Sequence, residues 1–369
     1  MSGALVAMSG GVDSSVAALL TVKRGLNCVG SMMKLFANED IGISHWGNPG
    51  KTCCSVKDAA DAADVARGLG IPFYVFNFAD TFKEEVIDRF IEAYQNGKTP
   101  NPCIDCNRYL KFERLLRRAK ELEKEYIVTG HYARIEDGAG NGRRLLKKGV
   151  DPFKDQSYML YAMTQEQLGA ALFPLGELHK SQVREIALEH GFVNAEKRDS
   201  QDICFVHSGS YAEFIEDYVR RKTGMETPKG RFVDTDGNDL GEHRGIIHYT
   251  VGQRRGLGLS AAAPLYVCAV HPEDNSVVVG SADSLFAKTL IARDINLIPV
   301  EKLDTAMKVR ARIRYNQREQ PATVWQLDSD TLRIEFDSPQ KAITSGQAVV
   351  LYDGETVIGG GTINDVILN

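Results

Sequence analysis

The stretch Ser9-Gly10-Gly11-Val12-Asp13-Ser14-Ser15 follows a short apolar run, residues 4–8, and leads into an amphipathic stretch, residues 16–23. This order predicts a β-strand, a tight turn and a helix. The two glycines let backbone amides close around an oxyanion, the three serine hydroxyls add donors, and the positive end of the helix points at the same place. The alternative is a Gly-Ser turn that binds nothing. The sequence favours a phosphate cradle at the start of an α/β domain.

The cradle has no lysine before its last hydroxyl residue, so it is not the G-x-x-x-x-G-K-S/T loop of kinases and GTPases. It resembles the PP-loop of ATP pyrophosphatases. That resemblance implies a loop that holds the pyrophosphate of ATP while the adenylyl group passes to an oxygen of a substrate. The loop alone names only a superfamily.

Up to about residue 135, apolar strand runs alternate with helical patterns, as in a parallel sheet. The predicted strands are residues 4–8, 28–34, 73–78 and 126–129, and the predicted helices are residues 12–24, 56–69, 81–94 and 109–123. Gly25, Gly70 and Gly97 stand where C-terminal helix caps belong. Because ligands bind beyond the carboxyl ends of parallel strands, we expect the cradle, the segment after Met33 and Gly130-His131-Tyr132 around one crevice.

Beyond residue 135 the pattern changes twice. A hairpin-like insert with three glycines, residues 136–144, precedes two helical patterns, residues 157–168 and 180–190, which we expect as a helical appendix of the first domain. From about residue 245 onward short alternating strands predict an all-β region, with strands at residues 265–270, 276–280, 349–352 and 355–358. A break near residues 281–288 predicts two β modules.

One predicted strand, residues 307–315, is strongly basic on one face. The period of two places Lys308, Arg310, Arg312 and Arg314 on the same side. A solvated edge strand is one explanation. A row of like charges is unfavourable unless an anion neutralises it, so the pattern favours contact with nucleic-acid phosphates.

Length and composition limit the class of protein. A chain of 369 residues predicts two or three domains, and a net charge of −5 with 25% charged residues confines any nucleic-acid surface to a local patch. No signal peptide and no apolar run long enough to span a bilayer is evident, so we expect a cytoplasmic protein without membrane contact. Seven cysteines, an odd number, favour chemistry over a disulfide framework.

The cysteines fall into different settings. Cys103 and Cys106 lie in a Pro-rich loop that runs into a helix, where a thiol ionises more readily, and Cys204 follows a polar segment. Cys28 and Cys268 lie in apolar runs and are interpreted as buried small hydrophobes. Four interpretations remain open for the first group. Cys103 and Cys106 are either inert thiols or half of a zinc site, or they join Cys204 in an iron-sulfur cluster or in metal-free chemistry in which one thiol carries sulfur and another resolves a disulfide.

Taken together, these features resemble the tRNA-specific 2-thiouridylases over nearly the whole chain. The matching segments include residues 7–14, 33–34, 129–133, 154–158, 199–205, 250–257, 314–315 and 345–347. The segments Ser-Gln-Asp-Ile-Cys-Phe and Val-Gly-Gln-Arg-Arg-Gly-Leu are the most specific. The resemblance implies an adenine nucleotide alpha hydrolase-like domain with a PP-loop, residues 1–208, a central β-rich tRNA-contacting domain, residues 209–283, and a C-terminal β-barrel, residues 284–369.

The reaction that the resemblance implies is ATP-dependent thiolation of the wobble uridine of tRNA. ATP, with Mg²⁺, adenylates the carbon-2 oxygen, and persulfide sulfur replaces that oxygen, releasing AMP and pyrophosphate. The implied enzyme is a tRNA-uridine 2-sulfurtransferase whose partners are tRNA and a persulfide donor, either a cysteine desulfurase or a sulfur-relay protein. We expect a monomer.

The resemblance also assigns residues. The catalytic set is Cys106 as nucleophile, Cys204 as persulfide carrier and Asp13. The ATP site comprises Ala7, Met8, Ser9, Gly10, Gly11, Val12, Asp13, Ser14, Met33 and Gly130. The tRNA contacts comprise Asn101, Pro102, Cys103, His131, Lys154, Asp155, Gln156, Arg314, Tyr315 and Gln347.

One position departs from the family pattern. Many members carry Asn-Pro-Asp where this chain has Asn101-Pro102-Cys103. The thiol at Cys103 keeps the iron-sulfur alternative open and adds a second candidate nucleophile. Two other classes also remain: a small-molecule PP-loop ligase, which needs neither the basic strand nor Cys204, and a non-catalytic RNA-binding module, which needs no ATP cradle.

Overall fold

The computed structural model describes residues 2–36, 56–138, 140, 142–197, 203–206 and 210–367. The loop at residues 41–52, Cys53, Cys54 and most of the polar segment before Cys204 lie outside these ranges. The chain divides into two compact units. Unit 1 comprises Met1–Val86, Pro102–His207 and Glu355–Val357, and unit 2 comprises Ile87–Asn101, Ser208–Gly354 and Ile358–Asn369.

Unit 1 is built on a parallel five-stranded sheet with the strand order β3-β2-β1-β4-β7. Its strands are β1 Gly3–Ala7, β2 Asn27–Lys34, β3 Phe73–Asn77, β4 Tyr126–Val128 and β7 Ala171–Leu172. The first four confirm the predicted strands. The fifth was not predicted, because two residues are too short to form a pattern. The central strand β1 is buried along most of its length, which explains why its sequence is a continuous apolar run.

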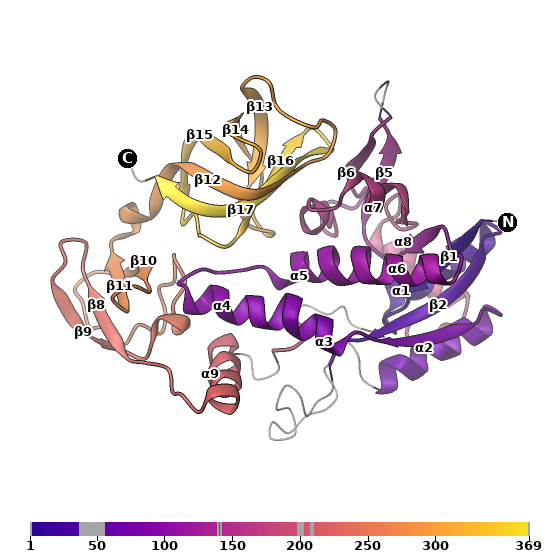
Figure 1. The fold of residues 1–369 in the computed structure, drawn as a ribbon, viewed down its shortest axis with the longest axis horizontal. Helices are drawn as coiled ribbons and strands as arrows, with labels where there is room; N and C mark the ends of the chain where they lie inside the picture. Colours follow the sequence, from indigo (N-terminus) through magenta and orange to yellow (C-terminus); the bar gives the residue numbers. More distant parts are fainter. Residues whose placement is uncertain are drawn as a thin grey trace. The chain divides into compact units, whose positions relative to one another are not determined.

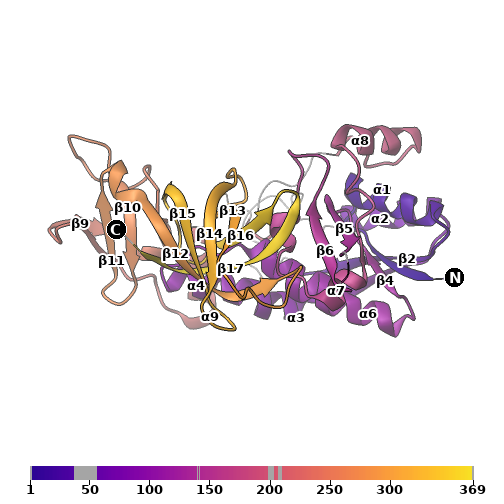
Figure 2. The same ribbon diagram turned by 90° about the horizontal axis from the view of Figure 1, so that it is seen from above.

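Helices cover both faces of this sheet. The long ones are α1 Val12–Lys23, α2 Val56–Gly68 and α8 Lys180–Glu189, together with a continuous helix formed by α5 Pro102–Asp105, the π-helical stretch η3 Cys106–Arg114 and α6 Leu115–Glu121. Figure 2 places α1, α2 and α8 on one side of the sheet and α6 on the other. The core between them includes side chains of β1, α1 and α2.

Two helix predictions in unit 1 need correction. The helix predicted at residues 109–123 begins at Pro102, since proline fits the first position of a helix. The helix predicted at residues 157–168 is instead a 3-10 turn, η4 Ser157–Leu160, and a separate short helix, α7 Gln165–Gly169. Thr164 interrupts the pattern because its side chain forms a capping box with Gln167 and starts a new helix.

The glycine-rich insert of unit 1 forms the expected hairpin, with strands β5 Ala133–Asp137 and β6 Arg144–Lys148 pairing antiparallel. The predicted C-terminal caps Gly25, Gly70 and Gly97 all adopt positive φ. The helical stretch at residues 79–95, predicted as 81–94, consists of α3 Ala79–Phe82, η2 Lys83–Asp88 and α4 Arg89–Gln95.

Unit 2 contains two β modules, as predicted. The first is a four-stranded sheet with the order β10-β11-β8-β9, formed by β8 Gly230–Val233, β9 Asp239–His243, β10 Tyr266–His271 and β11 Ser276–Gly280. The strands β8 and β9 begin before residue 245, where the all-β region was expected to start. The helix α9 Tyr211–Thr223 was not predicted; Ser210 caps its start and Gly224 its end.

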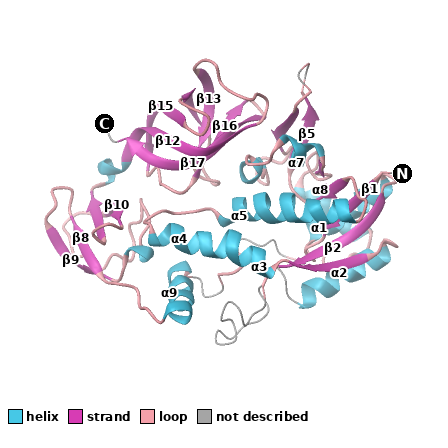
Figure 3. Ribbon diagram, viewed as in Figure 1, coloured by secondary structure: helices cyan, strands magenta, loops and turns pink. Residues whose placement is uncertain are grey.

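The second module is a closed barrel of six strands, drawn in orange and yellow in Figure 1. Its strands are β12 Phe286–Leu297, β13 Met307–Arg312, β14 Gln320–Gln326, β15 Leu332–Lys341, β16 Ala348–Asp353 and β17 Thr356–Ile367. The pairing of β12 with β17 closes it. The 3-10 turn η5 Ile246–His248 lies between β9 and β10 of the first module, and η6 Ala282–Leu285 follows β11. Figure 3 shows that unit 2 consists mostly of strands and loops.

Candidate active site

The glycine-rich loop between β1 and α1 has the geometry of an anion cradle. Gly10 has φ +72°, and a Cβ atom there would lie 2.3 Å from the carbonyl oxygen of Asp58. Only glycine fits such a position. Gly11 precedes the first turn of α1 without capping it through a side chain, so the amides of that turn keep their capacity for an anion.

The serine hydroxyls of the loop differ in accessibility. Ser9 is exposed, whereas Ser14 and Ser15 are buried. The Ser14 hydroxyl accepts the backbone N–H of Ser9 at 3.1 Å and donates to the carbonyl of Gly11 at 3.0 Å. Ser15 also donates to Gly11 at 3.1 Å. These bonds hold the loop in shape, and Ser9 is the hydroxyl that faces outward.

Asp13, in the first turn of α1, is surrounded by donors. The ammonium of Lys180 lies 2.7 and 2.8 Å from its two carboxylate oxygens, and the hydroxyl of Tyr132 donates to one of them at 2.7 Å. Lys180 is the first residue of α8. A lysine thus stands beside the cradle although the loop sequence contains none, and sequence reasoning missed it because it is 167 residues away from Asp13.

A second set of side chains fixes the peptide of Gly10. The amide of Asn194 donates to its carbonyl oxygen at 3.0 Å, and the ammonium of Lys197 donates at 2.9 Å. Lys197 also forms ion pairs with Asp58 and Asp61. Burial lowers the pKa of Lys197, but hydrogen bonds to these two carboxylates outweigh it and leave the pKa above its ordinary value. None of these residues carries a signal in the sequence alone.

The loop after β4 forms the facing wall, as the sequence predicts. A Cβ atom on Gly130 would lie 2.8 Å from the backbone carbonyl carbon of Asp13, so the two loops are in direct contact. Met33 lies near the carboxyl end of β2, two residues past the partner of Ala7. The predicted residues Ala7 to Ser14, Met33 and Gly130 therefore lie at the carboxyl edge of one sheet, where a ligand is expected.

His131 is buried beside this wall. Its Nδ1 lies 2.6 Å from the hydroxyl of Thr129, and its Nε2 lies 3.5 Å from the ammonium of Lys111. Burial, followed by the charge of Lys111, lowers the pKa of His131 well below its ordinary range. The ring packs against Phe112 and Phe173, and its lowered pKa favours the neutral form.

The segment Lys154-Asp155-Gln156 is tied to the same wall. The carboxylate of Asp155 is buried and accepts the backbone N–H groups of Gly149 and Ser157, each at 3.1 Å. Gln156 exchanges hydrogen bonds with the backbone of Tyr132 through its side chain and its own N–H. Lys154 is partly buried. Of the three, Lys154 is the side chain best placed for an external anion.

The candidate thiols belong to unit 1. Cys103 is exposed and Cys106 is partly buried, both near the start of the helix that begins at Pro102. Asn107 anchors this helix by donating to the carbonyl of Met159 at 3.0 Å. Cys204 is partly buried, and the ring of its neighbour Phe205 packs on Phe82 at 5.7 Å.

The other two described cysteines differ. Cys28 is buried, as predicted, whereas Cys268 is only partly buried. Burial raises the pKa of both thiols. Within the part of the chain that the structure describes, no group of three His, Cys, Asp or Glu side chains is arranged to hold a metal ion. No described helix is long and apolar enough to span a membrane.

The predicted basic row in unit 2 keeps its alternation, since Val309 and Ala311 are buried between exposed or partly exposed charges. Acidic groups lie close to it. Nζ of Lys308 lies 3.6 Å from a carboxylate oxygen of Asp337, and Nε of Arg310 lies 3.8 Å from a carboxylate oxygen of Glu319. Arg312 donates to the carbonyl of Gln317. The row is therefore partly neutralised, and Lys308 and Arg310 are its most exposed members.

Arg314 and Gln347 hold loops of unit 2 together. One terminal nitrogen of Arg314 reaches the carbonyls of Val251 and Ala342 and the hydroxyl of Thr344, between 2.8 and 3.2 Å. Gln347 donates to the carbonyl of Thr99 at 2.7 Å, next to Pro100 and Asn101.

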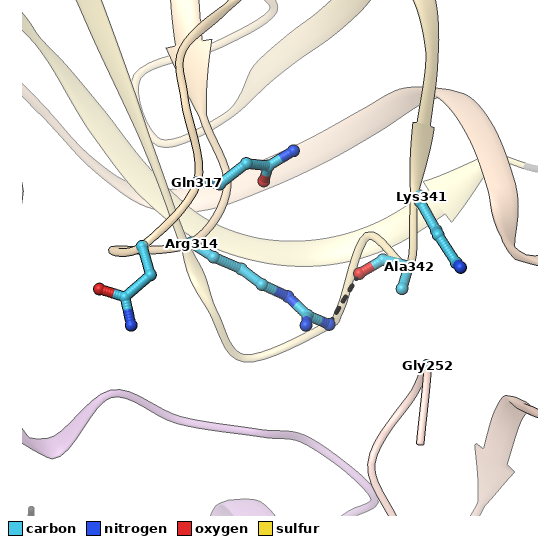
Figure 4. A pocket seen from close by; sticks show the side chains of 6 residues that line it. Gly252, Arg314, Gln317, Lys341 and Ala342 are labelled. Atoms are coloured by element: carbon cyan, nitrogen blue, oxygen red, sulfur yellow. Dashed lines mark hydrogen bonds between the residues drawn. The ribbon is translucent and has the colours of Figure 1, made fainter. Parts of the chain in front are cut away.

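Arg314 also lines a pocket of about 360 Å³, shown in Figure 4. The other lining residues are Gly252, Asn316, Gln317, Lys341 and Ala342. Two cationic side chains at one opening make this pocket a candidate contact for an anion.

Known protein families match most of the chain. The model of the tRNA methyl transferase HUP domain matches residues 3–208, that of the tRNA methyl transferase PRC-barrel domain matches residues 212–281, and that of the aminomethyltransferase β-barrel domain matches residues 287–363. The tRNA-specific 2-thiouridylase MnmA of Clostridioides difficile is 47% identical, over 97% of both chains. The chain belongs to the tRNA-specific 2-thiouridylase family.

Other relatives agree. The MnmA protein of Lachnoclostridium phytofermentans is 48% identical over 98% of this chain and 99% of its own, and MnmA 1 of a Thermoanaerobacter species is 49% identical over 97% of both. Membership of the 2-thiouridylase family confirms the resemblance seen in the sequence. It also confirms the fold class, an α/β domain followed by a PRC-barrel and a closed β-barrel.

Proposed function

We propose that this protein is a tRNA-uridine 2-sulfurtransferase that thiolates the wobble uridine of tRNA at the expense of ATP. The observation that carries the proposal is the cradle at Gly10, with Asp13 and Lys180 beside it, in the same unit as Cys106 and Cys204. A small-molecule ligase of the PP-loop class would need the cradle alone. Family membership favours the sulfurtransferase over that rival and over a non-catalytic RNA-binding module.

In the proposed ATP site, the pyrophosphate lies at the start of α1, on the amides of the loop and the exposed hydroxyl of Ser9. Met33 and Gly130 border the nucleotide. Lys180 supplies positive charge near the bond that breaks, and Tyr132 orients Asp13.

Mg²⁺ fits this donor set, since it commonly binds one or two carboxylates together with substrate phosphates, and Asp13 offers such a carboxylate. When bound, the ion would neutralise charge on the phosphates. Binding would place Lys180 and the metal in competition for Asp13.

The proposed sulfur transfer uses two thiols. The terminal sulfur of a persulfide on Cys204 attacks carbon 2 of the uridine, and AMP leaves with the former oxygen. The thiolate of Cys106 then attacks Sγ of Cys204, which breaks the bond between that atom and the transferred sulfur. The products are thiolated uridine and a Cys106–Cys204 disulfide.

The proposed tRNA surface divides by exposure. The side chains proposed to contact RNA, or to shape the loops that do, are Lys154, Arg314, Tyr315 and Gln347. Residues 101–103 are proposed to lie near the target base. His131 and Asp155 are buried and bonded within the chain, so we assign them to the shape of the surface. Enclosing a flipped base would expose its carbon-2 oxygen to ATP.

The remaining parts of the proposal concern the sulfur donor, the oligomeric state and the location in the cell. A persulfide-carrying desulfurase or relay protein would load Cys204. We expect a cytoplasmic monomer, which sedimentation of the purified protein would check.

The decisive experiment measures pyrophosphate release from ATP with and without unmodified tRNA. Release that depends on tRNA, with AMP and 2-thiouridine formed in equal amounts, supports the proposal. Release without tRNA would favour a small-molecule ligase instead. Iron and acid-labile sulfide assays on anaerobically purified protein distinguish a persulfide mechanism from an iron-sulfur cluster on Cys103, Cys106 and Cys204.

A further inference from the structure

Cys103 and Cys106 form a pair of thiols, of which the proposed sulfur transfer uses only Cys106. They lie three residues apart at the start of a single helix, a spacing that puts both side chains on one helix face. Cys103 is the more exposed of the two. A Cys-x-x-Cys pair at a helix start is an arrangement in which one thiol attacks a disulfide formed by the other.

Cys204 lies in a segment that shares a neighbour with this pair. Phe205 packs on Phe82 of α3, and α3 in turn packs on η3, the helical stretch that begins at Cys106. All of these residues belong to unit 1. The segment of Cys204 and the helical stretch that contains Cys106 thus both pack against α3.

The disulfide formed in the proposed reaction must be reduced before the next turnover. Each turnover ends with a disulfide between Cys106 and Cys204, and no persulfide can be loaded until Sγ of Cys204 is released. Both atoms of that disulfide come from partly buried residues, whereas Cys103 is exposed. A protein reductant reaches an exposed sulfur more readily than a partly buried one.

We propose that Cys103 is a further catalytic residue, which resets the enzyme after each turnover. This inference rests on the proposed function. The thiolate of Cys103 attacks Sγ of Cys106; a Cys103–Cys106 disulfide forms, the Cys106–Cys204 bond breaks, and the electron pair leaves on Sγ of Cys204. A dithiol reductant from the medium then reduces the exposed Cys103–Cys106 disulfide by two electrons and two protons, and is itself oxidised to a disulfide.

The other described cysteines are less suited to this step. Burial raises the pKa of Cys28 and Cys268, which lowers their thiolate fraction, and the thiolate is the attacking species. Cys268 lies in unit 2, on β10. It therefore offers a matched control for replacement of a partly exposed cysteine.

The test combines a trapping experiment with a kinetic one. Protein loaded with persulfide is allowed one turnover on tRNA without reductant, then alkylated in acid and mapped by mass spectrometry. We expect a Cys103–Cys106 disulfide with Cys204 alkylated in the wild type and in Cys268→Ser, and a Cys106–Cys204 disulfide in Cys103→Ser. A wild-type Cys106–Cys204 linkage with Cys103 alkylated, or a linkage to Cys53 or Cys54, would overturn the inference.

In the kinetic experiment, the steady-state rate of each variant is compared with the rate of its own first turnover. With thioredoxin as reductant, the ratio of steady-state rate to first-turnover rate should fall about tenfold or more in Cys103→Ser and Cys103→Asp, but not in Cys268→Ser. An unchanged ratio in the Cys103 variants would overturn the inference. Failure of the proposed function itself is recognised separately, because the wild type would then form no 2-thiouridine in its first turnover.

Discussion

At the scale of single residues, the structure adds Lys180 to the residues that the sequence places at the proposed ATP site. The PP-loop has no lysine of its own, yet the fold brings this ammonium within 2.8 Å of both oxygens of Asp13. Charge fixed beside the bond that breaks is worth most in a site that excludes water. A residue from the start of a distant helix thus contributes a positive charge beside the loop.

If Lys180 stabilises the leaving pyrophosphate, Lys180→Met should lower the rate of tRNA-dependent pyrophosphate release about a hundredfold while ATP still binds. Equilibrium binding and single-turnover release measure the two effects separately. Lys222→Met removes an exposed lysine that pairs with Asp88 and serves as the control. Equal losses of binding and rate in Lys180→Met would instead indicate that the lysine only holds the loop together.

His131 gives a prediction about pH. Its pKa in the folded protein lies well below the ordinary value, owing to burial and then to Lys111. Below about pH 6.5 the unfolded chain binds a proton that the folded protein does not, so stability falls as the pH drops. The melting temperature should therefore decrease less between about pH 7.5 and pH 5.5 in His131→Asn than in the wild type. Identical pH profiles would contradict the assignment of a buried neutral ring.

At the scale of elements, strand β13 illustrates what a sequence pattern can and cannot predict. The period of two correctly places Val309 and Ala311 inside the barrel and the basic residues outside. It does not reveal that Arg312 donates to the carbonyl of Gln317, which depends on the turn after the strand, or that Arg314 donates to the carbonyl of Ala342, 28 residues away. The basic row is thus partly a set of internal contacts.

The salt dependence of tRNA binding separates the two roles of this row. The double variant Lys308→Gln, Arg310→Gln removes its most exposed charges. If both meet phosphates, the slope of log affinity against log salt should fall by about one unit per lost contact, with ATP binding unchanged. Arg333→Gln, an exposed arginine of β15 that pairs with Glu335, is the control. An unaltered slope would make the row a solvated face.

At the scale of the whole molecule, the sequence predicts the architecture better than the boundaries within it. The alternation of strands and helices, the two β modules and the approach of the Gly130 loop to the cradle follow from local patterns and one topological rule. Asn194, Lys197 and Lys180 could not be predicted, because their roles depend on contacts made by folding. The thiols of the candidate site are visible in the sequence because cysteine is rare and chemically distinctive.

The interleaving of the two units leads to a prediction about truncation. Residues 87–101 precede the second half of unit 1 in the chain but belong to unit 2. Tyr94 stacks on Tyr211 with ring centroids 4.4 Å apart, and the backbone of Thr99 is bonded to Ser345 and Gln347. A fragment that ends at residue 208 would therefore retain this segment without the partners that cover it.

We expect the fragment 1–208 to bind a hydrophobic dye and to melt at a lower temperature than the full chain, because Tyr94 loses its stacking partner. In the full chain, Tyr211→Ala should reproduce part of this loss of stability, about 1–3 kcal/mol for a partly buried aromatic that loses its ring contact. Polar replacement of Tyr94 in the fragment should reduce dye binding if this surface is responsible. A fragment that melts cooperatively at the full-length temperature would mean that residues 87–101 fold equally well with unit 1 alone, and that the PP-loop unit is independent of the β modules for its stability.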